Sequence, residues 1–167
     1  MNQFPIYLLA HNVRSLHNVG AFFRTADAFG VSGVFLSGFS GTPKNPKLAK
    51  VSLGAEKQIP WEHFKTAGQA INALRSKVPG LTVCALENRT KQKIVPLNAY
   101  VPKGPMLLVV GNEVKGMSKA LLSLCDYILE IPMLGSKESL NVSVAAGIAL
   151  YYLRFKCFGA AIAVGVT

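Results

Sequence analysis

Short apolar runs alternate with longer amphipathic stretches along most of the chain. The apolar runs, several rich in β-branched residues, predict strands at 6–10, 31–37, 57–61, 81–87, 106–110 and 127–131. The amphipathic stretches predict helices at 17–29, 64–77, 118–124 and 140–155. Residues 38–50 contain glycine, serine, threonine and two prolines, a composition typical of a loop. Strands that alternate with helices predict an α/β fold with a mostly parallel sheet and helices on both faces.

The ends of three predicted strands are candidate binding positions. In sheets of parallel strands, ligands bind beyond the carboxyl ends of the strands. The segments that begin after Glu87, Val110 and Ile131 occupy this position and carry glycine, proline and polar residues. Neither a linker nor an internal repeat divides the 167 residues, so we expect one domain over 1–167, with an apolar tail at 157–167.

The first predicted helix carries two charged residues among Phe, Val and Ala. Arg24 and Asp27 are three positions apart and could form a surface ion pair. Alternatively, Arg24 could hold a phosphate group, because a guanidinium is planar and donates two parallel hydrogen bonds. Asn18 could be a helix cap, and Gly30 is expected to end the helix.

A glycine-rich segment from Gly111 to Ser118 follows the wholly apolar strand at 106–110. Glycine allows the backbone to approach a ligand closely. A strand, a glycine-rich turn and a helix resemble a phosphate-binding loop, but Met117 stands where a Walker A motif requires lysine. A nucleotide hydrolase of the P-loop type is therefore disfavoured, and an ordinary turn remains the alternative.

A polar segment connects the last predicted strand to the last helix. It leaves the strand at Pro132 and includes Ser136 to Ser139 before the helix begins. Ser139 or Asn141 could cap this helix. Small residues at 145–147 and 149 would let another element pack closely against it. On pattern alone, a buried helix with a polar cap is the simpler interpretation.

The charge and the cysteines narrow the classes of partner and compartment. The net charge is +10, and residues 1–100 hold 12 basic and 4 acidic side chains, an excess of 8. This excess favours a polyanionic partner, because Lys and Arg neutralise phosphates, and a solvated basic surface is the alternative. The chain has three cysteines, an odd number, and none of them lies in a CxxC or His/Cys cluster: Cys84, Cys125 and Cys157. They are expected to be buried in a reducing, cytoplasmic protein without a metal.

The chain shows no signal peptide, and its uncharged runs are shorter than the roughly 20 residues that a membrane-spanning helix needs. We therefore expect no membrane partner. The three histidines are isolated, and 38–41 lacks the GxSxG spacing of a serine nucleophile, so the sequence shows no catalytic triad.

Three segments taken together resemble a known family. In order, they are NVGAFFRTADAFG, LVVGNEVKGMS and IPMLGSKESLNVSVAAGIALYYL. They resemble the three motifs of the SPOUT methyltransferases, in the SpoU/TrmH branch, over about Tyr7 to Leu153. The resemblance implies an α/β fold with a deep C-terminal trefoil knot, a rare exception to ordinary chain topology. It also implies a homodimer that binds S-adenosylmethionine in the knot and methylates the ribose 2′-hydroxyl of tRNA or rRNA.

The same resemblance implies roles for individual residues. The positions that match catalytic residues of the family are Arg24, Asn18, Glu113, Ser139 and Asn141. The positions expected to contact the cofactor are Leu86, Gly111, Ile131, Met133, Ser139 and Leu140. A guanidinium keeps its proton near neutral pH. We therefore hypothesise that Arg24 holds the neighbouring phosphate and that this phosphate takes the proton of the 2′-hydroxyl.

Many members of the family carry an added RNA-binding domain before this core, which here begins at about residue 5. We therefore expect a compact form in which the core dimer itself holds RNA, with tRNA preferred to rRNA. The basic residues available for this contact are Arg14, Lys44, Lys47, Lys50, Lys91 and Lys93. A catalytically silent RNA-binding module on the same fold is the main alternative.

Overall fold

The computed structural model describes residues 4–88, 90 and 94–156. Its centre is a parallel sheet of seven strands in the order β3-β2-β1-β6-β4-β7-β5. The strands are β1 (Ile6–His11), β2 (Gly33–Ser37), β3 (Trp61–Phe64), β4 (Thr82–Leu86), β5 (Val95–Pro96), β6 (Met106–Val110) and β7 (Tyr127–Glu130). The helices are α1 (Leu16–Ala28), α2 (Pro46–Ser52), α3 (Ala55–Gln58), α4 (Ala67–Lys77), α5 (Lys119–Leu122), α6 (Val142–Lys156) and the short 3-10 helix η1 (Leu97–Ala99).

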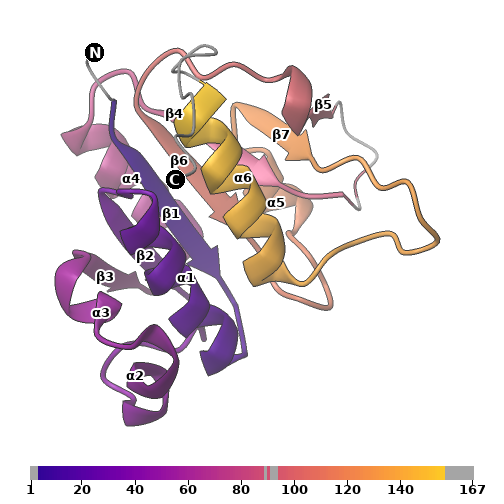
Figure 1. Ribbon diagram of the computed structural model, residues 1–167. Coiled ribbons are helices and arrows are strands. Elements are labelled where there is room, and N and C mark those ends of the chain that lie inside the picture. The colour runs from indigo at the N-terminus through magenta and orange to yellow at the C-terminus, as the bar shows by residue number, and fades with distance from the viewer. Residues whose placement is uncertain (1–3, 89, 91–93, 157–167) are drawn as a thin grey trace, which may run out of the picture.

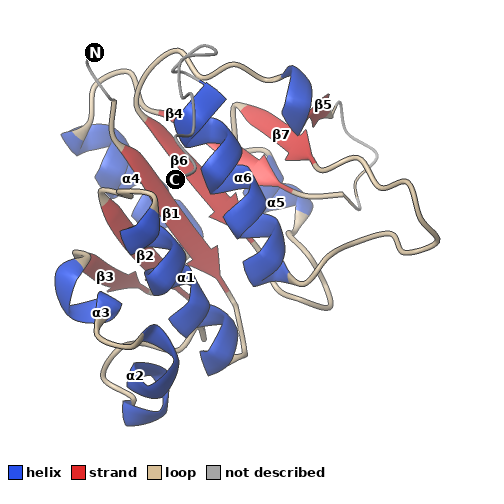
Figure 2. Ribbon diagram, viewed as in Figure 1, coloured by secondary structure: helices blue, strands red, loops and turns tan. Residues whose placement is uncertain are grey.

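Both faces of the sheet are buried, as the wholly apolar strand β6 requires. Side chains alternate along a strand, so Met106, Leu108 and Val110 enter one core with α1 and α6. Leu107 and Val109 enter the other core with α4 and α5. Figure 2 shows helices in front of the sheet and behind it. The predicted α/β class, with a parallel sheet covered on both faces, is confirmed.

Helix α1 has a defined beginning and end. Ser15 precedes it, and its hydroxyl accepts a hydrogen bond from the backbone N–H of Asn18 at 3.3 Å. After the helix, Gly30 adopts a φ of +59°, and its N–H donates to the carbonyl of Asp27 at 3.2 Å. The expected helix end at Gly30 is therefore confirmed. The interpretation of Asn18 as the cap is wrong, because Ser15 occupies that position.

The segment between β2 and β3 corrects two predictions. Residues 38–50 were expected to form a loop, but α2 begins at Pro46, and Asn45 caps it through a 3.0 Å bond from the N–H of Lys47. A strand was expected at 57–61, where α3 ends and β3 then begins at Trp61. Short helices of this kind depend on tertiary contacts. Here α2 packs against α1 at Gly20, where an added Cβ would lie 2.7 Å from the Cβ of Val51.

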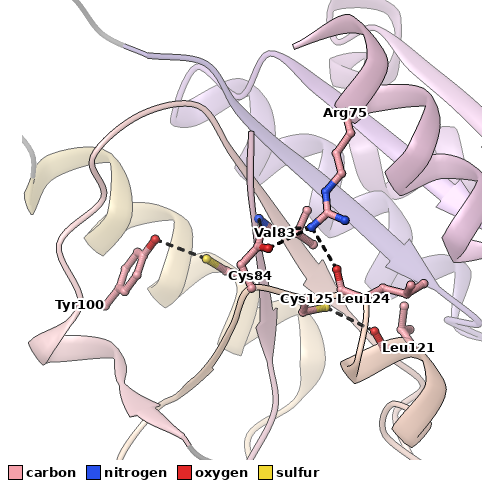
Figure 3. Close-up of polar contacts among 8 residues, drawn as sticks. Arg75, Val83, Cys84, Tyr100, Leu121, Leu124 and Cys125 are labelled. Atoms are coloured by element: carbon pink, nitrogen blue, oxygen red, sulfur yellow. Dashed lines mark hydrogen bonds and ion pairs between the residues drawn. The ribbon is translucent and has the colours of Figure 1, made fainter. Parts of the chain in front are cut away.

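A polar cluster joins α4 to the edge of the sheet where the strands begin (Figure 3). Asp126 accepts a hydrogen bond from the N–H of Val83 at 2.7 Å and forms an ion pair with Arg75 at 3.0 Å. Arg75 also donates to the carbonyl of Leu124 at 3.2 Å. The cluster thus connects α4, β4 and the turn before β7.

Replacing Asp126 with alanine is expected to destabilise the fold by about 1–2 kcal/mol, because the N–H of Val83 loses its acceptor. That corresponds to a fall in Tm of roughly 2–8 °C. Thermal and urea denaturation measure the effect. Asp27→Ala is the matched control, since Asp27 is exposed on α1. Equal stability of the two variants would contradict the structural role of the cluster.

Two of the three cysteines lie among the described residues. Cys84 is buried, and burial raises the pKa of its thiol to about 12, so the expected burial is confirmed there. Cys125 is only partly buried, so the same expectation is wrong for it. Cys157 and the tail 157–167 lie outside the described residues. Among the helices that the structure describes, none has the length and apolar character to cross a membrane.

Candidate functional site

A pocket opens where β4, β6 and β7 end. The pocket lies where the sequence placed candidate binding positions, and the segments after β4, β6 and β7 all contribute residues to it. The last wall comes from the start of α6, and this helix lies in front of β4 and β6 in Figure 1. The lining residues are Leu86, Glu87, Asn88, Val110, Gly111, Asn112, Glu113, Gly116, Ile131, Met133, Ser139, Leu140, Asn141, Val142 and Ala145.

All six residues expected to contact the cofactor line this one pocket. Their side chains are mostly apolar, and two polar residues after β4 lie among them. Asn88 donates to the carbonyl of Ile131 at 2.9 Å and accepts from its N–H at 3.3 Å. Glu87 accepts from the N–H of Met117 at 2.9 Å. The pocket therefore combines an apolar wall with a carboxylate and an amide.

Gly111 occupies a position without room for a side chain. A Cβ there would lie 2.5 Å from Cγ of Met117 and 3.1 Å from the backbone carbonyl group of Gly116. The segment folds back on itself at this point, and Asn112 bridges to Gly116. Glycine was expected here so that backbone could approach a ligand. In the structure, the backbone that approaches Gly111 closely is that of Gly116, at the other end of the same segment.

A chain of hydrogen bonds joins the three sequence segments at the rim of the pocket. Glu113 accepts from the side-chain amide of Asn18 at 3.0 Å and from the N–H groups of Arg14 and Ser15 at 3.2 Å each. Asn141 donates to the side-chain oxygen of Asn18 at 3.2 Å. Asn18 is buried. Its side chain therefore connects two segments that are far apart in the sequence.

Asn141 also begins the last helix. Its side-chain oxygen accepts from the N–H and the hydroxyl of Ser143, at 2.9 and 2.7 Å. Of the two residues proposed as caps, Asn141 is thus the one that caps α6, which fixes the helix next to the pocket. Ser139 is exposed and lines the pocket two residues earlier.

Two opposing effects set the protonation of Glu113. Burial raises the pKa of its carboxyl. The hydrogen bonds that the carboxylate accepts from its own backbone, Asn18, Arg14 and Ser15 lower the pKa and together outweigh burial. The pKa therefore lies below its ordinary value of 4.5. A lowered pKa in the folded state means that the ionised carboxylate stabilises the fold above the ordinary value. This stabilisation is lost as the pH falls through the folded pKa.

The Glu113→Gln variant is expected to show this pH dependence. Its destabilisation relative to the natural chain should be largest near neutral pH and should shrink as the pH falls below 4.5. Urea denaturation over this pH range measures it, with Glu62→Gln on the exposed surface of β3 as the control. A destabilisation by Glu113→Gln that is constant over the range would contradict the assigned hydrogen bonds.

Arg24 lies apart from this chain of hydrogen bonds. Its side chain is exposed on α1 and does not line the pocket. Within the described part of the chain, it forms no ion pair with Asp27, which is also exposed. The simple surface pair considered from spacing is therefore not formed, and the guanidinium is available to an external anion.

Comparison with known proteins identifies the family. The model of the SpoU rRNA Methylase family matches residues 5–151. The chain belongs to the SpoU rRNA Methylase family. The resemblance seen in the three segments is therefore confirmed.

Relatives of this SpoU methylase chain include longer proteins. It is 35% identical over 147 residues to the 23S rRNA (guanosine-2′-O-)-methyltransferase RlmB of Pseudomonas aeruginosa, which covers 88% of this chain and 57% of the relative. A second RlmB, from Pseudomonas putida, is 33% identical over the same shares of both chains. The chain thus spans a little over half the length of these curated relatives.

Solved structures of SpoU methyltransferases share the fold. AviRb from Streptomyces viridochromogenes, in complex with the cofactor AdoMet, gives a TM-score of 0.83 at 27% identity and covers 95% of this chain and 60% of that chain. The A. aeolicus TrmH/SpoU tRNA modifying enzyme gives 0.77 at 30% identity, with 92% and 75% covered.

The basic residues proposed for RNA contact are divided between regions of the SpoU methylase chain. Arg14, Lys44, Lys47 and Lys50 are exposed, and only Arg14 lies next to the pocket, through its N–H bond to Glu113. Lys91 and Lys93 lie outside the described residues. In the part of the chain that the structure covers, no three His, Cys, Asp or Glu side chains are grouped to hold a metal.

Sequence reasoning missed four residues of the site. Glu87 and Asn88 follow β4, Asn12 follows β1, and Asn112 follows β6. Asn112 donates to the carbonyl of Asn12 at 2.8 Å and accepts from the N–H of Lys115 at 2.9 Å. Each is a polar residue one or two positions after the end of a strand. Their position near the carboxyl ends of parallel strands is the sequence signal that marks them.

Proposed function

We propose that this chain binds S-adenosylmethionine in the pocket and transfers its methyl group to a ribose 2′-hydroxyl of RNA. The observation that carries the proposal is the chain of hydrogen bonds from Glu113 through Asn18 to Asn141 at the pocket rim. All three motifs of the family meet there. An AdoMet complex of a SpoU methyltransferase with the same fold supports the choice of cofactor.

The lining of the pocket suits the two halves of this cofactor. Apolar side chains, among them Leu86, Ile131 and Leu140, offer a slot for an adenine ring. The Glu87 carboxylate and the backbone around Gly111 offer partners for hydroxyl and ammonium groups. When bound, S-adenosylmethionine supplies a methyl group on a sulfonium. The chain's own task is then to position the RNA oxygen, which is the larger part of catalysis in such a transfer.

Arg24 is assigned to the RNA and not to the cofactor. Its exposed guanidinium lies outside the pocket lining, so cofactor binding does not require it. A guanidinium remains charged near neutral pH and binds phosphate with two parallel hydrogen bonds. Under this proposal, Arg24 holds the phosphate next to the target ribose, and an oxygen of that phosphate accepts the proton of the 2′-hydroxyl.

The substrate of the proposed transfer is either tRNA or rRNA, and an assay that offers the chain both RNAs distinguishes them. Two relatives named for 23S rRNA match this chain, and a similar structure is described as a tRNA modifying enzyme. We propose tRNA as the substrate, with rRNA as the alternative that the two RlmB relatives favour. We also propose that the chain acts on this RNA in the cytoplasm. The proposal treats residues 1–167 as one methyltransferase domain, and the C-terminal trefoil knot stays a prediction.

Methyl transfer from labelled S-adenosylmethionine to unmodified tRNA and rRNA tests the proposal. Label should appear in one of the two RNAs, and mapping should locate it on a ribose 2′-oxygen. An Asn141→Ala variant should incorporate far less label, since the wall of the pocket is altered. RNA binding without any labelled product would support the silent binding module instead.

A stripe on α6 supports the proposed homodimer. Val144, Ile148 and Tyr151 are 50%, 42% and 56% exposed and are spaced along one side of the helix. The Tyr151 ring lies 5.7 Å from that of Phe29 and 4.9 Å from that of Phe155, between ring centroids. A continuous exposed apolar surface of this kind is typical of a subunit interface. We assign it to a second copy of this chain.

Ile148→Glu is expected to convert the dimer into a monomer, because it would bury a charge at the centre of the stripe. Light scattering after gel filtration measures the mass. Leu53→Glu serves as control, since Leu53 is 70% exposed away from α6. The dimer assignment fails if the natural chain is already monomeric at the concentration used, or if both variants remain dimeric.

A further inference from the structure

A second hollow lies beside the proposed cofactor pocket. It is lined by the last residue of β1 and by residues that follow β1, β2 and β6, including His11, Asn12, Arg14, Phe39, Lys115 and Ser118. Asn112 and Gly116 line both hollows, so the two share a wall. Nothing in the proposed transfer of the methyl group uses Phe39 or Lys115.

Phe39 presents an aromatic ring to this groove. Its side chain is 59% exposed, which is unusual for a phenylalanine in a loop that is otherwise firmly held. The N–H of Phe39 donates to the side-chain oxygen of Asn12 at 3.2 Å. The next residue, Ser40, is buried and donates to the carbonyl of Ala10 at 3.0 Å. The backbone that carries the ring is therefore fixed on both sides.

Asn12 joins the walls of the groove to one another. It adopts a φ of +57°, a conformation that few residues other than glycine accept. Its side chain contacts Nε2 of His11 at 3.0 Å, and its carbonyl accepts from Asn112 at 2.8 Å. Asparagine adopts this conformation more readily than most residues. The hydrogen bond between Asn12 and Asn112 holds the segments after β1 and β6 together.

The charged side chains along the groove are basic. Arg14 and Lys115 are both exposed, and they line the groove with Phe39. An aromatic ring on which a base can stack, next to cations that contact phosphates, is the usual construction of a site for single-stranded nucleic acid. Unpaired RNA bases stack on aromatic side chains in this way, whereas bases within a duplex are not available for it.

We propose that this groove binds the unpaired RNA strand next to the target nucleotide, with one base stacked on Phe39 and phosphates held by Arg14 and Lys115. The inference rests on the proposed function, because the groove shares a wall with the proposed cofactor pocket. It adds a substrate class: the target lies in a single-stranded loop, and Phe39 determines how the neighbouring base is held.

The test uses the full chain and a short single-stranded oligoribonucleotide that carries one 2-aminopurine. Stacking on an aromatic ring quenches the fluorescence of this base, and anisotropy gives the affinity. Phe39→Ala should weaken binding by about tenfold and abolish the quenching. Phe39→Tyr should retain both, because its ring can still stack. Val101→Ala is the matched control, since Val101 is also half exposed but precedes β6.

A second pair of variants tests the cations. Lys115→Ala should reduce the slope of log affinity against log salt concentration by about 1, as expected for one lost phosphate contact. Lys77→Ala, on an exposed residue at the end of α4, should leave this slope unchanged. Equal slopes for the two variants would remove Lys115 from the proposed groove.

Two outcomes overturn the inference: no binding of the oligonucleotide by the natural chain, or the same affinity and quenching for Phe39→Ala and Val101→Ala. These results are distinct from failure of the proposed function. Binding and quenching that depend on Phe39, without methyl transfer to any RNA, would support the groove and contradict the activity. Methyl transfer at the natural rate by Phe39→Ala would support the activity and contradict the groove.

Discussion

The Arg24→Lys variant is expected to lose nearly all methyl transfer, at least about 100-fold, while its affinity for S-adenosylmethionine stays that of the natural chain. Lysine keeps the charge but lacks the planar pair of donors that fixes a phosphate in one orientation. A reacting group displaced by about 1 Å can lower a rate by 10²-fold. Because Arg24 does not line the pocket, the cofactor should bind as before.

Single-turnover transfer rates and calorimetry with S-adenosylmethionine measure the two effects separately. Arg75→Lys is the matched control, because Arg75 lies in the cluster at the opposite edge of the sheet and contacts Asp126. That variant should keep its transfer rate. If Arg24→Lys lost cofactor affinity in proportion to turnover, Arg24 would belong to the cofactor site and the proposed phosphate contact would be wrong.

The Gly111→Ala variant, unlike Arg24→Lys, should bind S-adenosylmethionine more weakly, with the affinity reduced about tenfold or more. The added methyl group would meet Met117 at 2.5 Å and the backbone of Gly116 at 3.1 Å. A side chain can move aside, but the backbone of Gly116 can do so only if the whole segment shifts. Overpacking of this kind typically costs about 1–3 kcal/mol. Because Gly111 and Gly116 both line the pocket, its wall is expected to shift with them.

Gly104→Ala is the control for Gly111→Ala, because nothing lies within 4 Å of a Cβ at Gly104. Calorimetry with S-adenosylmethionine and thermal denaturation should both distinguish the two variants. Natural cofactor affinity in Gly111→Ala would show that the segment adapts without loss, and the tight packing at this glycine would then have no role in binding.

The sequence predicted the layers of the fold because one strong signal dominated. Strand β6, Met106–Val110, was predicted with its observed bounds, since five consecutive apolar residues suit a strand that is buried on both faces. The end of α1 was also predicted, because Gly30 supplies a conformation that other residues avoid. Where local preference and tertiary packing agree, the residue pattern is sufficient.

The pattern failed where packing decides. Helix α2 was missed although Asn45 and Pro46 form a typical helix start, because its seven residues are too few to be stable alone. Its place depends on Gly20 in α1, which leaves room for Val51. Strand β5 has two residues and gives no periodic signal at all.

For the site, the sequence by itself determined the chemical groups, and the family resemblance determined their proposed roles. Only the tertiary structure decided which groups meet. Asn18 lies 95 residues from Glu113 and 123 from Asn141, yet its side chain bonds to both. The tertiary structure also places Arg24 outside the cofactor pocket and Phe39 in the groove beside that pocket. The physical reason is that parallel strands end at one edge of the sheet, so the order of strands in space, and not distance along the chain, sets which side chains become neighbours.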